Sequence, residues 1–587
     1  MSWRRVLLMG VVVWLVACSG ASSRTSDETS PDLSTVVPLD GTMAAVIADR
    51  EACAPNDNDG TVTVWHSMGG PAATDLWAEL EVEFESTHSV KLDVVNFGGD
   101  RAILDELAAT SRDDWPDLVD VSEQSIQTLF DTNQFLVPAV CNPVVGADLL
   151  PLIRKTYSVN DELLALPFAV SSPILIFDAA EFRTAGLDPT APPLTLDGLL
   201  SASKALADTG ASPYGLVLTD SCANLVLDQF SAKREVPVGG GENGHDLNPV
   251  TFDFATAENA ADLAALAEGV VAGHVKYLGG SENNLNDLVE LSNTTEAGGA
   301  MTIHTSGALG DVIRLLGNYP GVELGVGPLP GPGVGALIGG NAMWLPMNTD
   351  PEQVGRAWSV LEWLYEPQRL SRLAIEAGFV PPTESAAKDP ALLARWGEYP
   401  QLRVAYQQVV NTRVTAASAG VLVGPFSGKA GIFYETCDKI IKRGADVTAT
   451  LQWATNAVNE VLQDYAAQRN GEPSTSPSDS VDAVSPPSAT EISGTVECVS
   501  GAEVVGVYVV GETLPDVNQG FATYDDTKAS KVGYRFVLPY GGRYQLHVGC
   551  GGSRSEWGSE SFTVFVSESS DFLCRDDPPK RGSCETL

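Results

Sequence analysis

Basic residues are scarce in this sequence. Its 587 residues include 35 lysines and arginines against 76 aspartates and glutamates, so the formal net charge is −41. A protein that binds nucleic acid needs a basic surface to neutralise phosphates, and one that adsorbs to anionic lipid headgroups needs basic clusters. We therefore expect no nucleic-acid partner and no electrostatic attachment to a membrane. An acidic, soluble surface is the simplest interpretation, and an acidic patch with a specific role is the alternative.

Motifs for catalysis and metal binding are also missing. The sequence has no GxSxG, HExxH, P-loop or CxxC motif, and its six histidines are scattered. Residues 56–60 (NDNDG) lack the alternating ligands and closing glutamate of an EF-hand, so we interpret them as a turn. We expect no metal, no cofactor and no catalysis. A glycan-acting enzyme with paired carboxylates stays open, because the separation of two acids cannot be read from a sequence.

A single apolar run suggests contact with a membrane. Arg4 and Arg5 precede Val6–Val16, which is shorter than the ~20 residues that a membrane-spanning helix needs. A basic start followed by a short apolar run is typical of a secretory signal. The following Leu15-Val16-Ala17-Cys18 resembles a bacterial lipobox. We predict a lipoprotein signal peptide at residues 1–17 and a lipid on Cys18, with an ordinary signal peptide as the alternative.

The chain has nine cysteines, and lipidation of Cys18 would leave eight. An even number outside the cytosol favours disulfides. Near the C-terminus we predict the pairs Cys498–Cys550 and Cys574–Cys584. The four cysteines of the main part of the chain allow three connectivities, all of which stay open: Cys53, Cys141, Cys222 and Cys437.

Strands and helices alternate through most of the chain. The first predicted elements are strand 61–65, helix 73–86, strand 90–97, helix 101–110 and strand 117–121. This order favours a parallel sheet covered by helices, that is, an α/β fold. Two long amphipathic helices are predicted further on, at residues 357–377 and 447–468.

The composition changes twice outside this region, and the chain is too long for one ordinary core. Residues 18–60 are rich in Ser, Thr, Asp and Pro and are predicted to be a flexible tether before the domain at 61–468. Residues 469–490 are a Pro/Ser-rich linker. Residues 491–587 show a period of two and predict a small β-sandwich domain. Its predicted strands are 492–498, 504–510, 534–539, 543–548 and 561–566.

Short segments spread over residues 60–468 carry a family resemblance through their order and spacing, since none is diagnostic by itself. They are Val64–Gly69, Leu166–Phe168, Ser171–Leu175, Ala185–Pro189, Ala300–Thr302, Thr305–Leu309, Gly325–Pro330, Ile338–Trp344 and Ala377–Pro381. Together they resemble the extracellular solute-binding proteins of ABC importers, in the sugar- and glycerol-3-phosphate-binding branch.

The resemblance implies a periplasmic-binding-protein-like α/β fold with two lobes, a hinge and a cleft between the lobes. A small-molecule solute would bind in the cleft and shift the protein from an open to a closed population. The implied partners are this solute and an ABC permease in the membrane, and we expect a monomer that catalyses no reaction.

A sugar or polyol is held by hydroxyl groups, backbone amides, carboxylates and an aromatic face. The residues that offer these groups at strand or loop ends, or at positions the family uses, are His66, Ser67, Asp100, Glu123, Ser171, Ser172, Ser306, Gly339, Gly340, Trp344 and Phe379. Alternatives stay open for some of them. Each serine could be a loop hydroxyl or a helix cap, His66 could brace the end of its strand, and Trp344 could pack in the core.

The sequence departs from the glycerol-3-phosphate-binding branch at several positions. Asp100 and Phe379 stand where tyrosines are expected, and aromatic residues are absent near Ser221 and Asn224. No arginine occurs at Pro425–Lys429, where that branch places one. A phosphate needs fixed donors or positive charge, so we expect a carbohydrate or polyol ahead of a glycerophosphate. A surface sensor or adhesin that uses the C-terminal domain is the rival function.

Overall fold

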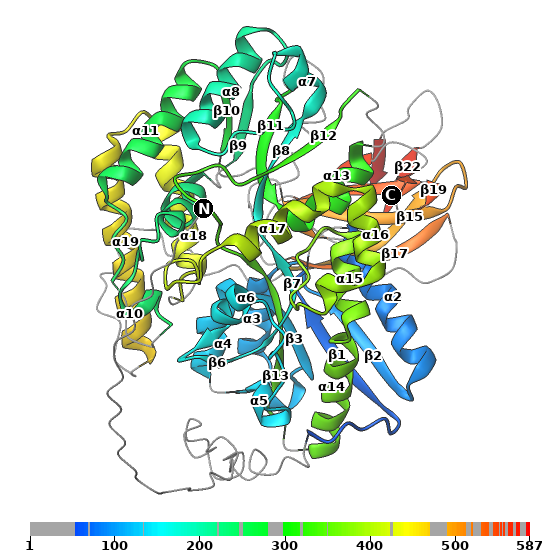
Figure 1. Cartoon of the computed structure of the whole chain (residues 1–587). Helices are drawn as coiled ribbons and strands as arrows, with labels where there is room; N and C mark the ends of the chain where they lie inside the picture. Colours follow the sequence, from blue (N-terminus) through cyan, green and yellow to red (C-terminus); the bar gives the residue numbers. More distant parts are fainter. Residues whose placement is uncertain are drawn as a thin grey trace, which may run out of the picture.

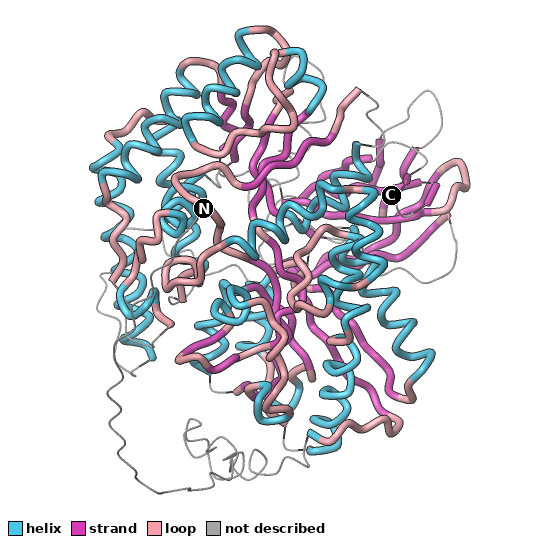
Figure 2. Tube along the Cα trace, viewed as in Figure 1, coloured by secondary structure: helices cyan, strands magenta, loops and turns pink. Residues whose placement is uncertain are grey.

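The computed structural model shows two α/β lobes and a set of C-terminal sheets (Figures 1 and 2). The predicted signal peptide, Cys18 and most of the tether and linker lie outside the residues that the structure describes. These are residues 53–586 except 69–70, 133, 220–221, 246–250, 280–297, 317–320, 349, 423–425, 470–489, 512–517, 520–529, 539–543, 551, 554–555, 558–561, 567–570 and 576–582.

Lobe 1 is built on a sheet with the strand order β2-β1-β3-β13-β4, in which β7 also pairs with β13. The strands β1, β2 and β3 are parallel, as the alternation of strands and helices predicted, and β13 runs antiparallel to its neighbours. The strands are β1 (Gly60–His66), β2 (Val90–Asn96), β3 (Leu118–Ser122), β4 (Phe135–Leu136), β7 (Leu166–Ser171) and β13 (Gly339–Pro346). The helices are α2 (Pro71–Thr87), α3 (Asp100–Ala109), α4 (Ile126–Thr132), α5 (Pro138–Cys141), α6 (Pro151–Thr156), α13 (Leu309–Leu316), α14 (Pro351–Leu364), α15 (Pro367–Glu376), α16 (Pro390–Glu398) and α17 (Val404–Asn411).

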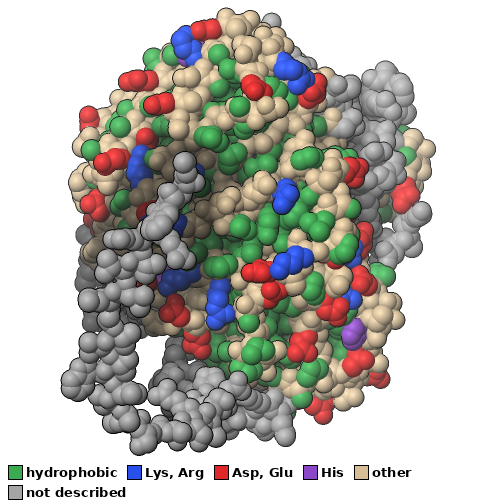
Figure 3. Space-filling view, viewed as in Figure 1, with side chains coloured by type: hydrophobic (Ala, Val, Ile, Leu, Met, Phe, Trp, Pro, Cys, Tyr) green, Lys and Arg blue, Asp and Glu red, His purple; other side chains and the backbone are tan. Residues whose placement is uncertain are grey.

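Lobe 2 is built on a sheet with the order β10-β9-β11-β8-β12. The strands are β8 (Pro173–Asp178), β9 (Leu216–Thr219), β10 (Val275–Gly279), β11 (Met301–Thr305) and β12 (Leu324–Pro328). The helices are α7 (Ala179–Thr184), α8 (Leu196–Asp208), α9 (Ser231–Lys233), α10 (Gly240–Asn243), α11 (Ala257–Val271), α18 (Phe426–Cys437) and α19 (Val447–Arg469). Two π-helical turns, η5 (Asn224–Phe230) and η9 (Asp438–Lys442), belong to the same lobe. On the face drawn in Figure 3, the surface is hollowed where lobe 2 (above) meets lobe 1 (below).

Each lobe has its own hydrophobic core and its own disulfide. Cys53 is bonded to Cys141 in lobe 1, and Cys222 is bonded to Cys437 in lobe 2. This pairing selects one of the three connectivities that the sequence left open. Because neither bond joins the two lobes, neither prevents them from moving relative to each other.

The segment before β1 is attached to lobe 1. Cys53 is buried in the core of that lobe, and the backbone amide of Asn56 donates to the hydroxyl of Ser359 over 2.8 Å. Asp57 accepts a hydrogen bond from the amide of Ser89 at 2.9 Å. The folded body therefore begins no later than Cys53. The boundary was predicted at residue 61, because a polar composition does not reveal such contacts.

The predicted helix at 357–377 is two helices, α14 and α15. Pro367 is the first residue of α15, and Glu366 before it has an extended backbone. A proline lacks the amide proton that a continuous helix needs and disfavours helical geometry in the preceding residue. The predicted helix at 447–468 is confirmed as α19. Among the described residues, no helix is both long and apolar enough to cross a membrane.

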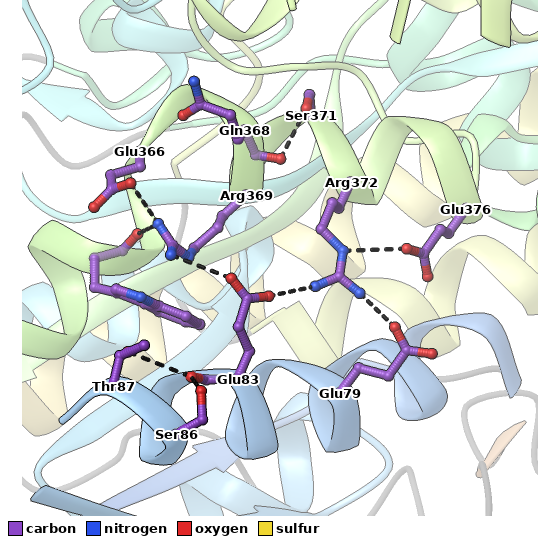
Figure 4. A network of polar contacts seen from close by, with 11 residues as sticks. Glu79, Glu83, Ser86, Thr87, Glu366, Gln368, Arg369, Ser371, Arg372 and Glu376 are labelled. Atoms are coloured by element: carbon purple, nitrogen blue, oxygen red, sulfur yellow. Dashed lines mark hydrogen bonds and ion pairs between the residues drawn. The ribbon is translucent and has the colours of Figure 1, made fainter. Parts of the chain in front are cut away.

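An ion-pair network joins α2 to α15 on lobe 1 (Figure 4). Arg372 contacts three carboxylates: Glu83 at 2.9 Å, Glu376 at 3.2 Å, and Glu79. Arg369 contacts Glu83 at 3.2 Å. Because a central arginine separates carboxylates that would otherwise repel one another, the network fixes the two helices side by side.

The C-terminal region holds two four-stranded sheets, ordered β17-β14-β22-β23 and β16-β15-β18-β21. The disulfide Cys498–Cys550 is confirmed and joins β14 of one sheet to β18 of the other. Cys574 is disulfide-bonded, and Cys584 lies opposite it in the β22–β23 register, as the second predicted pair requires. The face-to-face packing of a sandwich stays a prediction. The strands of the two sheets are β14 (Thr490–Cys498), β15 (Val504–Gly511), β16 (Asn518–Gln519), β17 (Lys531–Leu538), β18 (Tyr544–Cys550), β21 (Phe562–Val566), β22 (Phe572–Arg575) and β23 (Ser583–Thr586).

Candidate solute-binding site

The chain crosses between the lobes more than once, and two crossings meet at a hinge. The first crossing runs from β7 to β8 through Ser172, and another follows β11 at Ser306. The amide of Ser306 donates to the carbonyl of Ser172 over 2.9 Å, and the hydroxyl of Ser306 accepts from the amide of Ser172 at 3.2 Å. Both serines are fully buried. Here they hold two crossing strands together, and their predicted contact with solute stays a prediction.

Gln408 of α17 completes the hinge. Its side-chain amide donates to the hydroxyl of Ser172 and to the carbonyl of Pro173, both at 2.8 Å. Its carbonyl oxygen accepts from the amide of Leu329 at 2.7 Å, on the segment between β12 and β13. One buried side chain thus connects separate passages of the chain between the lobes. Sequence reasoning missed Gln408, because nothing in its local pattern indicates these distant partners.

Lys233 lies beside the hinge and is buried. Its ammonium group donates to the carbonyls of Leu329 at 3.0 Å and Gly335 at 2.6 Å. Burial lowers the pKa of Lys233 to about 8, because the charged form loses its hydration. This cation was not predicted, and backbone carbonyls occupy two of its three donors.

Asp100 is the centre of a hydrogen-bond cluster at the carboxyl ends of β1 and β3. It is the first residue of α3, where the helix dipole favours a negative charge. It accepts from the hydroxyls of Ser67 and Ser122 at 2.5 Å and of Ser125 at 2.7 Å, and from the amide of Ser122 at 3.0 Å. Ligands of open α/β sheets bind beyond the carboxyl ends of the strands. Asp100 is therefore in the expected place, but its oxygens already have protein donors, so it positions the serines around it.

Asn341 and Asp120 extend this cluster and were not predicted. The side-chain amide of Asn341 donates to the Ser67 hydroxyl at 2.9 Å and to Asp120 at 3.3 Å. Asp120 is fully buried, and burial together with the nearby charge of Asp100 raises its pKa well above the ordinary value. A charged residue inside the apolar strand Leu118–Ser122 was the available signal for Asp120.

Glu123 begins a short 3₁₀ turn after β3 and is half-buried. One carboxylate oxygen accepts from the amide of Gly340 at 2.8 Å. Burial, and to a lesser extent the charge of Asp100, raises the pKa of Glu123 to about 7, although the Gly340 amide opposes the shift. This carboxyl group therefore titrates near neutral pH.

The two predicted glycines lie against Glu123. Gly340 has a φ of +113°, and a Cβ atom there would lie 2.0 Å from the carbonyl oxygen of Ala169. Only glycine fits this position. Gly339 pairs with Ser171 across β13 and β7, so the structure brings Ser171, Gly339, Gly340 and Glu123 together. Tyr157, which was not predicted, donates its hydroxyl to the Gly340 carbonyl at 2.5 Å.

Two predicted residues lie inside lobe 1 and one lies at the hinge. His66 is 2% exposed, stacks on Trp77 and has its pKa lowered by burial to about 3. Trp344 is 2% exposed and meets Phe135 edge to face. Both rings are enclosed by the core, as the alternatives of a braced strand end for His66 and core packing for Trp344 require, and solute contact by either stays a prediction. Phe379 is half-buried, with its ring against Gly307 of the hinge turn.

The half-buried polar surface of lobe 1 is rich in hydrogen-bond acceptors. Asp100 and Glu123 supply carboxyl groups, Ser67 supplies a hydroxyl, and the fully buried Asp120 lies behind them. No lysine or arginine takes part in the hydrogen bonds described for this cluster. Carboxylates accept hydrogen bonds from solute hydroxyls and repel a phosphate. Within the described part of the chain, no group of three His, Cys, Asp or Glu residues is placed to hold a metal ion.

Comparison with known proteins gives consistent matches over the two lobes. Residues 79–403 match the model of the family described as bacterial extracellular solute-binding protein. The sn-glycerol-3-phosphate-binding periplasmic protein of Brucella abortus is 27% identical over 412 residues, covering 68% of this chain and 92% of that protein. The corresponding protein of Rhizobium meliloti is 25% identical over 412 residues, covering 68% and 93%.

Solved structures match the same part of the chain. The glycerophosphocholine complex of a Mycobacterium tuberculosis protein, UgpB, superposes with a TM-score of 0.57 at 18% identity, covering 69% of this chain and 99% of that one. The cyclic alpha-maltosyl-1,6-maltose binding protein of Arthrobacter globiformis gives a TM-score of 0.55 at 19% identity, covering 69% and 100%. At these identities the matches establish the two-lobed fold.

Proposed function

This chain belongs to the bacterial extracellular solute-binding proteins, which are non-enzymatic transport receptors, and from that premise we propose that it captures a neutral, hydroxyl-rich solute for an ABC importer. The proposed solute is a carbohydrate or polyol, bound between the lobes by a monomer that then delivers it to a permease in the membrane. Structural neighbours solved as a cyclic alpha-maltosyl-1,6-maltose binding protein and as a ribitol complex support this range of solutes, whereas other matches carry glycerol-3-phosphate or glycerophosphocholine in their names.

The observation that carries the choice of solute is the acidic cluster of lobe 1. A phosphate would meet the charge of Asp100 and, above about pH 7, that of Glu123, whereas sugar hydroxyls can donate to Glu123 and Ser67. Lys233, a cation beside the hinge, already donates to two carbonyls. Ser171 and Gly339 would line the same surface, and Phe379 would offer an apolar face from the hinge.

We further propose that lipid on Cys18 anchors the protein to the outer face of the membrane. The basic start, the short apolar run and the lipobox-like segment support this. Stable anchoring takes about two acyl chains, which a lipidated N-terminal cysteine can carry. A tether up to Cys53 would then keep the lobes near the permease and raise their effective concentration there.

A thermal-shift experiment on the full-length chain tests the choice of solute. Maltose and ribitol represent neutral solutes, and sn-glycerol-3-phosphate and glycerophosphocholine represent phosphates. A solute at a hundred times its Kd stabilises the folded protein by roughly 2.7 kcal/mol. We expect stabilisation by a neutral solute. Stabilisation by the phosphates alone would contradict the proposal.

For residues 491–587 we propose a separate β-sandwich with an accessory role. Its two sheets and the disulfide between them support this arrangement, and the region lies beyond the family match. A sensory or adhesive role is the alternative. Deletion of residues 470–587 distinguishes the accessory role from the adhesive one. If the domain is accessory, the deletion leaves solute uptake intact, whereas if it is adhesive, the deletion abolishes surface association.

A further inference from the structure

The two lobes also touch at a place apart from the hinge. The lower end of α19 and the short helix α10, both of lobe 2, lie beside α4 and α6 of lobe 1 (Figure 1). Two groups of contacts join the lobes here, one made by Tyr465 and the other by His245. Neither group involves the hinge residues Ser172, Ser306 or Gln408.

The first group centres on a carboxylate of lobe 1. Tyr465 of α19 donates its hydroxyl to Asp131 of α4 at 2.7 Å, and the residues are 334 positions apart in the sequence. Gln127, one turn earlier in α4, donates to the same carboxylate oxygen at 2.9 Å. The intrahelical bond from Gln127 holds the carboxylate toward lobe 2, where the tyrosine hydroxyl meets it.

The second group lies at a small hairpin of lobe 1, formed by β5 (Ser158–Val159) and β6 (Glu162–Leu163). One ring nitrogen of the buried His245 is 2.8 Å from the carbonyl of Ser158. The carbonyl of His245 accepts from the amide of Asn160, in the hairpin turn, at 2.9 Å. An ion pair between Lys155 and Glu242 lies next to these bonds at 3.5 Å.

The hairpin connects this contact to the candidate site. Tyr157 precedes it, and its hydroxyl donates to Gly340, whose amide in turn donates to Glu123. The contact therefore borders the surface that we propose binds solute. If the lobes moved apart about the hinge, the bond from Tyr465 to Asp131 and the bonds between His245 and the hairpin would have to break.

We propose that Tyr465 and His245 form a latch that holds the two lobes together before solute arrives. The latch goes beyond the proposed function. It rests on that function only in one respect, namely that closing the lobes assembles the solute-binding surface. Because of the latch, a fraction of the molecules has the binding surface assembled before solute binds. The apparent affinity of a protein for its ligand scales with the fraction that is competent to bind.

Single-molecule energy transfer on the full-length chain without solute tests the latch. Fluorophores on ketone-bearing unnatural residues at Val144 in lobe 1 and Val271 in lobe 2 avoid the disulfide cysteines, and these positions are 71% and 88% exposed. For Tyr465→Phe we expect a second population of transfer efficiency, with the open-to-closed ratio increased about tenfold, since a bond to a charged acceptor is lost. Tyr277→Phe is the matched control, because its hydroxyl donates to Asp438 at 2.9 Å within lobe 2.

Asp131→Ala removes the same bond from the side of lobe 1 and guards against a folding defect in one variant. The latch predicts that Asp131→Ala, Tyr465→Phe and the double variant share one shifted distribution, because each removes the same contact. Distributions of transfer efficiency that coincide with that of the unsubstituted protein would overturn the proposal. An equal shift in Tyr277→Phe would also overturn it, by showing that the loss of any tyrosine hydroxyl has this effect. Since no solute is used, either result is independent of the proposed solute class.

Discussion

Lobe 1 and the hinge both bring serines next to polar side chains, but the two regions use them differently. In lobe 1, Ser67 donates to Asp100 and stays half-buried at the end of β1. At the hinge, Ser172 and Ser306 are fully buried and bind each other and Gln408. The difference arises because chain passages cross at the hinge and cover it, whereas the end of the lobe 1 sheet stays at the surface. A strand-end serine is available to a solute only where no second crossing covers it.

Of the substitutions that test this comparison, Gly340→Ala should lower the free energy of unfolding most. It changes the lobe 1 region. The added Cβ would meet the Ala169 carbonyl, and the positive φ is strained for alanine. We expect the free energy of unfolding to fall by about 3 kcal/mol in urea denaturation. Gly397→Ala is the control: Gly397 lies in α16, and apart from its chain neighbours and the nearby backbone of that helix no atom is within 4 Å of its Cβ position. That substitution should be neutral or slightly stabilising, and an equal loss in both variants would contradict the account.

Glu123→Gln should change how stability depends on pH. The pKa of Glu123 is raised to about 7 in the folded protein from 4.5, so the folded state binds the proton more tightly than the unfolded state. Stability therefore falls as pH rises from about 4.5 to about 7. We expect this fall, on the order of 1–3 kcal/mol, in the unsubstituted chain between pH 5 and pH 8.

In Glu123→Gln the contribution of this carboxyl is absent. Urea denaturation at the two pH values measures the difference between the chains. The same pH dependence in both would show that Glu123 does not titrate in this range.

Ser172→Ala should affect the hinge more moderately. It removes the hydroxyl that accepts from Gln408, whose amide keeps its bond to the Pro173 carbonyl. We expect a loss of about 1 kcal/mol in the free energy of unfolding, and unchanged contacts with any bound solute. A solute affinity that falls more than stability accounts for would place Ser172 in the binding site after all.

Ser67→Ala should have the smallest effect on stability. In contrast to Ser172→Ala, it should weaken solute affinity. Its hydroxyl is half-buried and bonded to Asp100 and Asn341. We expect roughly 0.5–1 kcal/mol of destabilisation together with a weaker solute affinity by calorimetry. Unchanged affinity in Ser67→Ala would remove the distinction between the two regions.

Much of the fold could be predicted from local pattern. The strands β1, β2 and β3 and the helices α2, α3 and α19 lie where the alternation placed them, since amphipathic periodicity reflects which face is buried. The break at Pro367 was missed when one helix was predicted at 357–377, although proline inside a helical pattern was the available signal.

The site was harder to predict, because it depends on partners far apart in the sequence. Ser172 and Ser306 are 134 positions apart and Ser172 and Gln408 are 236 apart, so no local signal could show that they meet. Trp344 lies in the fully buried half of β13, where both faces are covered and alternation carries no information. Glu123 was identified through the family resemblance and Gly340 through the backbone amides that a glycine pair can offer, and the two lie together. Asp120 could have been found as a charge within an apolar strand.

Equilibrium dialysis of the full-length chain against mixed neutral sugars, polyols and glycerophosphates, followed by chromatography of the retained compound, tests the central claim most directly. The account predicts saturable retention of a neutral, hydroxyl-rich solute, recovered chemically unchanged and lost in Glu123→Ala. Retention of a phosphate-bearing solute alone, or recovery of a cleaved product, would contradict it.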